Sequence, residues 1–279
     1  ESLLKPIYQI AENAGFDGVE VTNWDADEAT AKSYRKASDE VDFPIQSVMR
    51  GWANFNKPEG FDADVESVEL ALNNAAIYGA SAILLVPCRT GGMAMPKPWD
   101  FDIEFDPKTC MVKKVVPGDN SEYEAYIKAQ NEATEASRRA IEKLIPVSEK
   151  TGVVIAVENV WNNLWVTPKL FAAFVRMFDC PQVRSYFDIG NHVKYANPVE
   201  YIDTLSDTLV RLHVKDFTVD KNAGSGGKFV DIRDGDVDWP TVRAAIERVG
   251  YNGWMTIEGS GGLSYEEQDK RLSMIIAGE

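Results

Sequence analysis

Short apolar runs alternate with amphipathic segments along almost the whole chain, and no other feature constrains the fold as strongly. The runs SAILLVPC at residues 81–88 and VVIAVENV at residues 153–160 are almost continuously apolar, which is the pattern of strands buried on both faces. The segments between the runs have helical spacing of apolar residues, as in residues 64–78, which end at Gly79. Strict alternation of strands and helices predicts a parallel sheet, in which each helix carries the chain back across the sheet.

The number of strands selects between the two common parallel architectures. We count seven strands and eight helices, and the first helix, residues 2–14, has no strand ahead of it. We therefore predict a (β/α)8 TIM barrel whose first strand is missing from, or trimmed off, the start of this numbering. A doubly wound open sheet is the alternative, but no glycine-rich phosphate-binding fingerprint follows any of the strands.

We expect a single domain over residues 1–279, because this length and a hydrophobic content of 44% suit one large α/β core. Residues from about 89 to 120 interrupt the alternation with a stretch rich in glycine, proline, aspartate and aromatic side chains. Connections of that length are usually functional. We expect this insertion to be a lid or an oligomer contact, which leaves a homo-oligomer open.

The charge balance limits the classes of partner. A net charge of -15 repels phosphate backbones and anionic membrane surfaces, so we expect neither nucleic acid nor a membrane as a partner. Cys88, Cys110 and Cys180 are widely spaced, which predicts no disulfide framework and no cysteine zinc site. No apolar segment reaches membrane-spanning length, so we expect a soluble protein. The cytoplasm is the expected compartment, and a secreted or periplasmic location after removal of a leader stays open.

Four predicted strands carry a metal-binding side chain at or near their ends. Glu158 lies in VVIAVENV, Asp188 in RSYFDIGN, His213 in VRLHVKDF and Glu258 in WMTIEGS. The carboxyl ends of barrel strands meet at one face, so we expect these side chains to lie together. Three carboxylates repel one another without a cation, and oxygen ligands with one imidazole suit a single Mn²⁺, Mg²⁺, Co²⁺ or Zn²⁺ ion. Glu20, in the earlier run GVEV, is expected to form a structural pair near the same mouth.

The same runs resemble a known family. VIAVENVWN, FDIGN, LHVKDF, GDVDWP and GYNGWMTIEG, with AENAGFDGVEV nearer the start, are similar to the xylose isomerase-like TIM-barrel superfamily. That superfamily includes sugar phosphate isomerases and epimerases, ketose 3-epimerases and inosose dehydratases. The resemblance implies that Glu158, Asp188, His213 and Glu258 bind one divalent metal ion, and that Glu158 and Glu258 also act as the catalytic acid and base on opposite faces of the substrate.

The resemblance and the residues together predict a metal-dependent sugar or sugar-phosphate isomerase or epimerase. A cation that polarises a carbonyl and the adjacent hydroxyl acidifies the carbon-bound proton between them, and two carboxylates can move that proton through an enediolate. The nearest alternative is an inosose-dehydratase-like lyase on a keto-sugar or keto-inositol, because the same enolate could expel a β-hydroxyl. A non-catalytic carbohydrate-binding barrel is a further alternative. The endonuclease branch of the superfamily needs several histidines, and this chain has only His192 and His213.

Further side chains near predicted strand ends are candidates for substrate binding. Lys215 points to the same side as the metal-binding histidine of its strand and could bind a phosphate or an enediolate oxygen. Asn191 stands where relatives often carry a substrate-contacting histidine, and Trp161 could form an apolar wall. Arg233 lies in a segment that resembles the family's loop over the site. The full set of predicted substrate contacts is Lys215, Asn191, His192, Arg50, Arg89, Trp161 and Arg233.

Overall fold

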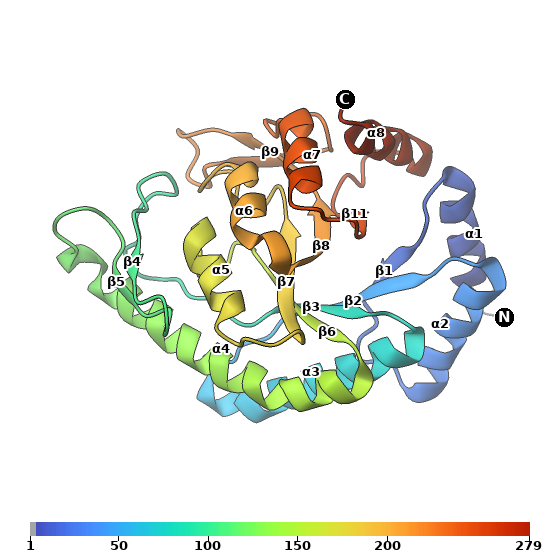
Figure 1. Ribbon diagram of the computed structural model, residues 1–279, viewed down its shortest axis with the longest axis horizontal. Coiled ribbons are helices and arrows are strands. Elements are labelled where there is room, and N and C mark those ends of the chain that lie inside the picture. The colour runs from blue at the N-terminus through green and yellow to red at the C-terminus, as the bar shows by residue number, and fades with distance from the viewer. Residues whose placement is uncertain (1–3) are drawn as a thin grey trace.

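Seven strands lie side by side in one parallel sheet in the computed structural model, which describes residues 4–279 (Figure 1). The order across the sheet follows the order along the chain, so each strand pairs with the next one that joins the sheet. These strands are β1 (Val19–Val21), β2 (Ile45–Trp52), β3 (Ala82–Val86), β6 (Val154–Glu158), β7 (Val183–Asp188), β8 (Leu209–Val214) and β11 (Met255–Ile257).

Helices connect the strands, and local chemistry sets several of their ends. The side chains of Asp27 and Ser264 accept hydrogen bonds from the first turns of α2 and α8, and Gly152 ends α4 with a φ of 71°. Within residues 4–279, no helix combines the length and the apolar character that crossing a membrane requires. The α-helices are α1 (Leu4–Ala14), α2 (Glu28–Val41), α3 (Phe61–Tyr78), α4 (Glu124–Thr151), α5 (Pro168–Arg176), α6 (Pro198–Leu205), α7 (Trp239–Arg248) and α8 (Tyr265–Ala277), and the short 3₁₀ helices are η1 (Pro58–Gly60), η2 (Ser121–Tyr123) and η3 (Ser206–Thr208).

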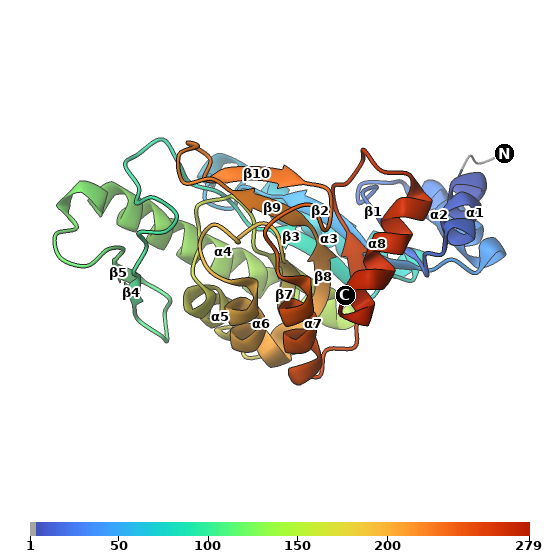
Figure 2. The same ribbon diagram turned by 90° about the horizontal axis from the view of Figure 1, so that it is seen from above.

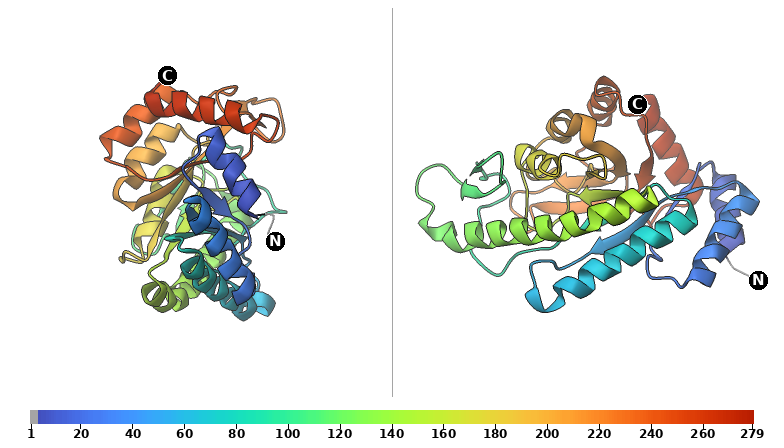
Figure 3. Two further views of the ribbon diagram at one scale, coloured as in Figure 1. Left: turned by 90° about the vertical axis from the view of Figure 1, so that its right-hand side faces the viewer. Right: turned by 60° about the horizontal axis from the view of Figure 1, so that its bottom comes forward.

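The sheet curls into a nearly closed barrel, which confirms the predicted TIM-barrel fold. β1 and β11 are its two ends, and within the described residues they do not pair with each other. A cavity of about 990 Å³ lies between them and is lined by both strands and by α1 and α8. These two helices contact each other and lie side by side (Figures 1 and 3). This cavity lies where an eighth strand would close the barrel. The predicted start of the first helix, at residue 2, lies outside the described residues.

Two segments that we expected to be irregular contain short antiparallel hairpins. The insertion at 89–120 contains β4 (Glu104–Phe105) and β5 (Val112–Lys114), and lies at the end of the molecule away from α1 (Figures 1 and 2). The loop after β8 contains β9 (Asp216–Val219) and β10 (Gly227–Val230). Both hairpins were missed because they are short and partly exposed, so they lack a buried apolar run. Whether the insertion is a lid or an oligomer contact stays a prediction.

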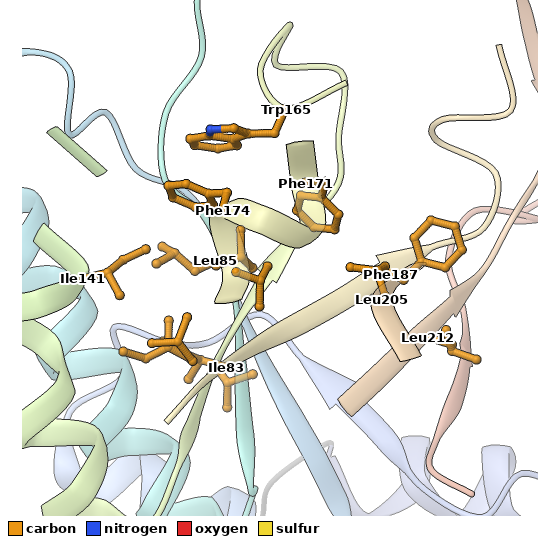
Figure 4. Close-up of a cluster of buried hydrophobic side chains, with 14 of the residues drawn as sticks. Ile83, Leu85, Ile141, Trp165, Phe171, Phe174, Phe187, Leu205 and Leu212 are labelled. Atoms are coloured by element: carbon orange, nitrogen blue, oxygen red, sulfur yellow. The ribbon is translucent and has the colours of Figure 1, made fainter. Parts of the chain in front are cut away.

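The two faces of β3 belong to different apolar clusters. Leu84 and Tyr186 pack together inside the barrel. Ile83 and Leu85, on the opposite face of β3, pack in the larger cluster between the sheet and the helices, together with Ile141 of α4 (Figure 4). Burial on both faces explains why these strands are continuous apolar runs in the sequence. It also makes the polar side chains at the strand ends stand out.

Candidate metal centre

Four side chains meet at the carboxyl ends of the barrel strands. Glu158 and Asp188 are the last residues of β6 and β7, His213 lies in β8, and Glu258 follows β11. Each offers one ligand atom, and these atoms all lie within 4.8 Å of one another. The register of β7 and β8 contributes to this meeting, because it places Asp188 beside His213. We call these four residues the quartet.

His213 lies at the centre of the quartet. Its Nδ1 is 3.3 Å from Glu158 Oε1, 3.4 Å from Glu258 Oε2 and 3.9 Å from Asp188 Oδ2. The side chains of Asp188 and His213 are inaccessible to solvent, whereas 31% of the Glu258 side chain is exposed. Glu258 is therefore the member of the quartet that a ligand reaches most easily.

The hydrogen bonds of Asp188 indicate that the quartet suits a cation. Its Oδ1 accepts hydrogen bonds from the backbone amides of Gly190 and Asn191, both at 2.8 Å. Its Oδ2 is buried and accepts no hydrogen bond from any residue between 4 and 279. A buried carboxylate oxygen without a hydrogen bond is unfavourable, and a cation would stabilise it. Three carboxylates and one imidazole fit a divalent ion such as Mg²⁺, Mn²⁺, Co²⁺ or Zn²⁺.

Burial and charge give the carboxylates of the quartet different proton affinities. Burial raises the pKa of Asp188 to about 8 and also raises the pKa of Glu158, because each ionised form loses its hydration. Burial acts in the same direction on Glu258, but the hydrogen bond and charge of His213 and the charge of Lys215 outweigh it and lower the pKa of Glu258. Burial therefore dominates at Glu158 and Asp188, and neighbouring positive charge dominates at Glu258.

Lys215 places a second positive charge against the quartet. Its Nζ lies 2.7 Å from Glu258 Oε2 and 3.5 Å from Asp188 Oδ2, and it donates a hydrogen bond of 3.4 Å to Asn191 Oδ1. Burial lowers the pKa of Lys215, but the charges of Asp188 and Glu258 outweigh it and raise the pKa. The ammonium group is therefore held in its charged form at the site.

Two asparagines brace the ends of β6 and β7. The amide of Asn159 donates to the Asp188 carbonyl at 2.8 Å and accepts from the Asp188 amide at 2.7 Å. The amide of Asn191 donates to the Asn159 carbonyl at 3.0 Å and approaches Glu158 Oε1 at 3.5 Å. Asn191 therefore touches a member of the quartet directly, and both asparagines hold metal-binding residues in place.

Aromatic rings form a wall beside the quartet. The ring centroid of Trp161 lies 5.6 Å from that of Phe217 and 4.9 Å from that of Phe229, and Phe229 is 39% exposed. The indole N–H of Trp161 donates to the Asn191 carbonyl at 2.6 Å, which fixes the ring next to the site. Lys215 Nζ lies 4.7 Å from the Phe229 ring centroid, so this wall reaches the quartet. Phe229, in β10 of the β9–β10 hairpin, was not among the predicted site residues.

The structure gives His192 a place in the core. Both ring nitrogens have partners, since Nε2 donates to the Val160 carbonyl at 3.0 Å and Nδ1 lies 3.1 Å from the Tyr201 hydroxyl. Burial lowers the pKa of His192 to about 4, which keeps the ring neutral at physiological pH. These contacts support a packing role for His192 and offer nothing for the predicted substrate contact.

Two of the predicted arginines make contacts within the protein. Arg50 is buried and donates to Ser67 at 2.7 Å and to the Trp52 carbonyl at 2.9 Å. Arg233 contacts the sulfur of Met274 on α8. These contacts use the charged ends of both side chains, so they give no support to the predicted substrate contacts.

Arg89 differs from these two arginines. Its guanidinium lies 5.6 Å from the centroid of the Trp52 ring, and the residue lines a cavity of about 700 Å³ that Trp161 also lines. Arg89 and Trp161, a ring of the aromatic wall, therefore line one cavity.

Glu20 is the quartet neighbour that the sequence did not assign to the site. Its Oε2 lies 2.9 Å from Nε2 of His213, and its Oε1 accepts a hydrogen bond of 2.5 Å from Ser47. The structural pair expected for Glu20 therefore exists, but its partner is a member of the quartet. The position of Glu20 at an early strand end was the only available signal, because no local pattern identifies the partner.

Fold and site together place the chain among TIM-barrel proteins with carboxylates and a histidine at the strand ends. The chain belongs to the xylose isomerase-like TIM barrel family, whose sequence model matches residues 8–272. A curated relative, the uncharacterized protein MJ1311 of Methanocaldococcus jannaschii, is 25% identical over 124 residues. That match covers 42% of this chain and 41% of the relative, so it spans less than half of either protein.

Solved structures share the fold over nearly the full chain. A D-tagatose 3-epimerase-like protein has a TM-score of 0.73 and 18% identity over 99% of this chain and 94% of its own. IOLI protein with a bound zinc atom has a TM-score of 0.73 and 14% identity over the same shares of the two chains. The probable 3-DHS dehydratase AsbF of Bacillus anthracis has a TM-score of 0.64 and 16% identity over 99% of this chain and 93% of its own. At these identities the likeness shows the fold.

Proposed function

We propose that this protein is a metal-dependent isomerase or epimerase of sugars or sugar phosphates that moves a proton next to a carbonyl through an enediolate. The observation that carries the proposal is the meeting of Glu158 and Glu258 with Asp188 and His213 in one group at the carboxyl ends of the strands. The ligand atoms of these four residues all lie within 4.8 Å of one another, so one bound cation and two carboxylates would face the same substrate. Proton removal and proton return each need a group that accepts or donates a proton, and two carboxylates at one site can share these tasks. The epimerase-like neighbour supports the same reaction class.

Each side chain at the site has a task in this reaction. A divalent ion held by the quartet would polarise a carbonyl and the hydroxyl beside it, which acidifies the carbon-bound proton between them. One glutamate of the quartet removes that proton, and the other returns a proton to the enediolate. Lys215 stabilises the negative charge that develops on the enediolate oxygen, because its ammonium is held at the quartet, 2.7 Å from Glu258. Trp161 and Phe229 pack against the sugar ring.

Isotope exchange tests the reaction class. The protein is loaded with Mn²⁺ and incubated in deuterated water with ketoses and their phosphates, and the recovered sugar is examined by mass spectrometry and NMR. We expect one deuterium on the carbon next to the carbonyl. Recovered sugar without label, under conditions in which the sugar is converted, would reject a proton transfer that exchanges with solvent.

Substitution of Glu158 and Glu258 tests whether these two residues transfer the proton. Glu158→Gln and Glu258→Gln should each abolish turnover, because an amide can neither remove nor return the proton. Metal binding is measured for both variants, so that loss of the ion is distinguished from loss of the base. Glu149→Gln, at an exposed position near the end of α4, is the matched control and should leave turnover unchanged. Substantial turnover in either quartet variant would reject the two-carboxylate mechanism.

A lyase is the second candidate, and the dehydratase among the structural neighbours favours it. The same enediolate could expel a β-hydroxyl from a keto-sugar or keto-inositol, with Lys215 or a glutamate protonating the leaving group. The product would carry a new conjugated carbonyl, which absorbs in the ultraviolet. A barrel that only binds carbohydrate would show neither label nor absorbance, and would still bind sugar after chelation of the metal.

All seven predicted substrate contacts stay predictions, and Lys215, Asn191, Trp161 and Arg89 have the best support. Lys215 and Asn191 contact members of the quartet. Trp161 contacts Asn191, and Arg89 lines the neighbouring cavity. An anionic group on the substrate would be attracted to Arg89, whose guanidinium forms no ion pair among the described residues.

A further inference from the structure

Glu20 contacts the quartet through the Nε2 nitrogen of His213. The two carboxylate oxygens have separate partners, Ser47 for Oε1 at 2.5 Å and His213 Nε2 for Oε2 at 2.9 Å. The side chain is only 7% exposed. Within residues 4–279 these are the two side chains to which the carboxylate hydrogen-bonds, so Glu20 braces little else in the fold.

The two nitrogens of His213 face different surroundings. Nδ1 points at carboxylate oxygens of Glu158, Glu258 and Asp188, at 3.3, 3.4 and 3.9 Å. Nε2 points at Glu20. A neutral imidazole carries its proton on one nitrogen and binds a metal ion through the other, and a carboxylate next to one nitrogen attracts the proton there.

We infer that Glu20 is a positioning residue that accepts the Nε2 proton of His213 and thereby makes Nδ1 the metal-binding nitrogen. The inference rests on the metal centre of the proposed function and adds a residue that sets the tautomer and orientation of its only imidazole. A histidine ligand held in this way keeps its lone pair directed at the ion, and it is also a stronger base. Glu20 acts through His213 and needs no contact with the substrate.

A chain of buried side chains holds Glu20 itself in place. Gln46 donates to the Ser47 hydroxyl at 2.8 Å, and Arg211 donates to Gln46 Oε1 at 2.5 Å. On the other side, the ring of Tyr186 packs against His213 with centroids 4.4 Å apart. The histidine is therefore fixed by a ring contact on its face and by the Glu20 carboxylate at its edge. This arrangement crosses the barrel interior, from β8 through β2 to β1 and back to β8.

Metal affinity of the full-length chain tests the inference without any need for turnover. Zn²⁺ and Co²⁺ dissociation constants are measured by competition with a chelator, and the visible spectrum of the Co²⁺ form reports its ligands. We expect Glu20→Leu to raise the dissociation constant about 10- to 100-fold and to shift the Co²⁺ spectrum, because the ring is free to turn. Glu20→Gln keeps an acceptor of the same shape, so we expect a smaller rise and an unchanged spectrum.

Asp216→Asn is the matched control. Asp216 is also fully buried near the end of β8, where it accepts hydrogen bonds from the backbone of Phe217 and from the indole of Trp239. The variant should lose stability and keep the wild-type metal affinity and spectrum. This result separates loss of a buried carboxylate in general from loss of the one that positions His213.

A folded Glu20→Leu protein with wild-type affinity and an unchanged Co²⁺ spectrum would overturn the inference. If that variant does not fold, Glu20→Gln decides, and an unchanged dissociation constant would overturn the inference there. The proposed function fails separately. A wild-type protein that binds Co²⁺ but converts no sugar would reject the proposed reaction and leave the role of Glu20 intact.

Discussion

His192 should make the protein less stable in mild acid, because its ring is buried as a neutral base. The residue is 1% exposed, and both ring nitrogens have partners in the core, the Val160 carbonyl and the Tyr201 hydroxyl. Burial lowers the pKa of His192 from 6.5 to about 4, and the nearby positive charge of Lys194 acts in the same direction. The hydrogen bond to Val160 opposes the shift without cancelling it.

The direction of the change in stability depends on whether the folded or the unfolded state binds the proton at the higher pH. Between pH 6.5 and pH 4 the unfolded chain protonates this histidine while the folded protein does not, so the contribution to stability is full above pH 6.5 and is lost as the pH falls toward 4. The complete loss corresponds to about 3 kcal/mol. Between pH 7.5 and pH 5.0 the loss is about 2 kcal/mol, most of the total, because pH 5.0 lies well below the unfolded pKa.

Urea unfolding of the wild type and His192→Gln at both pH values isolates this contribution. The glutamine cannot be protonated and keeps a donor for the Val160 carbonyl, so the wild type should lose about 2 kcal/mol more than the variant on acidification. Every other titrating group cancels in the difference. The chain has 2 histidines, so the same variant assigns the His192 ring resonances for an NMR titration. Equal losses in both proteins, or an NMR pKa near 6.5, would refute the reasoning.

Two further predictions concern the site. Lys215→Met should lower turnover at least about 10-fold and leave the protein able to bind metal, because it removes only the charge beside the enediolate; turnover equal to wild type would exclude Lys215 from the mechanism. A metal ion at about 100 times its dissociation constant should stabilise the fold by about 2.7 kcal/mol, a gain that EDTA reverses and that Asp188→Asn should largely lose.

Most elements and all four residues of the quartet could be predicted because their signals are local. A continuous apolar run such as residues 153–160 indicates a buried strand wherever it occurs, and Glu158 marks the end of that strand. The count of alternating elements then restricts the chain to a barrel, and parallel strands place their carboxyl ends on one side. The short hairpins of β4 with β5 and of β9 with β10 were not predicted, because strands of two to four residues show too little periodicity to be recognised in a sequence.

The partners of individual polar side chains could not be predicted, because they depend on which strands become neighbours and on how each side chain is oriented. Arg50 and His192 have the same residue types as substrate-binding groups, but the fold turns one toward Ser67 and the other toward Val160 and Tyr201. The contact of Glu20 with His213 joins residues 193 positions apart, so it has no trace in either segment. Periodicity along the chain specifies strands and helices through local backbone and burial preferences. The partner of a polar side chain is set by register, twist and ring orientation, which exist only once the barrel has formed.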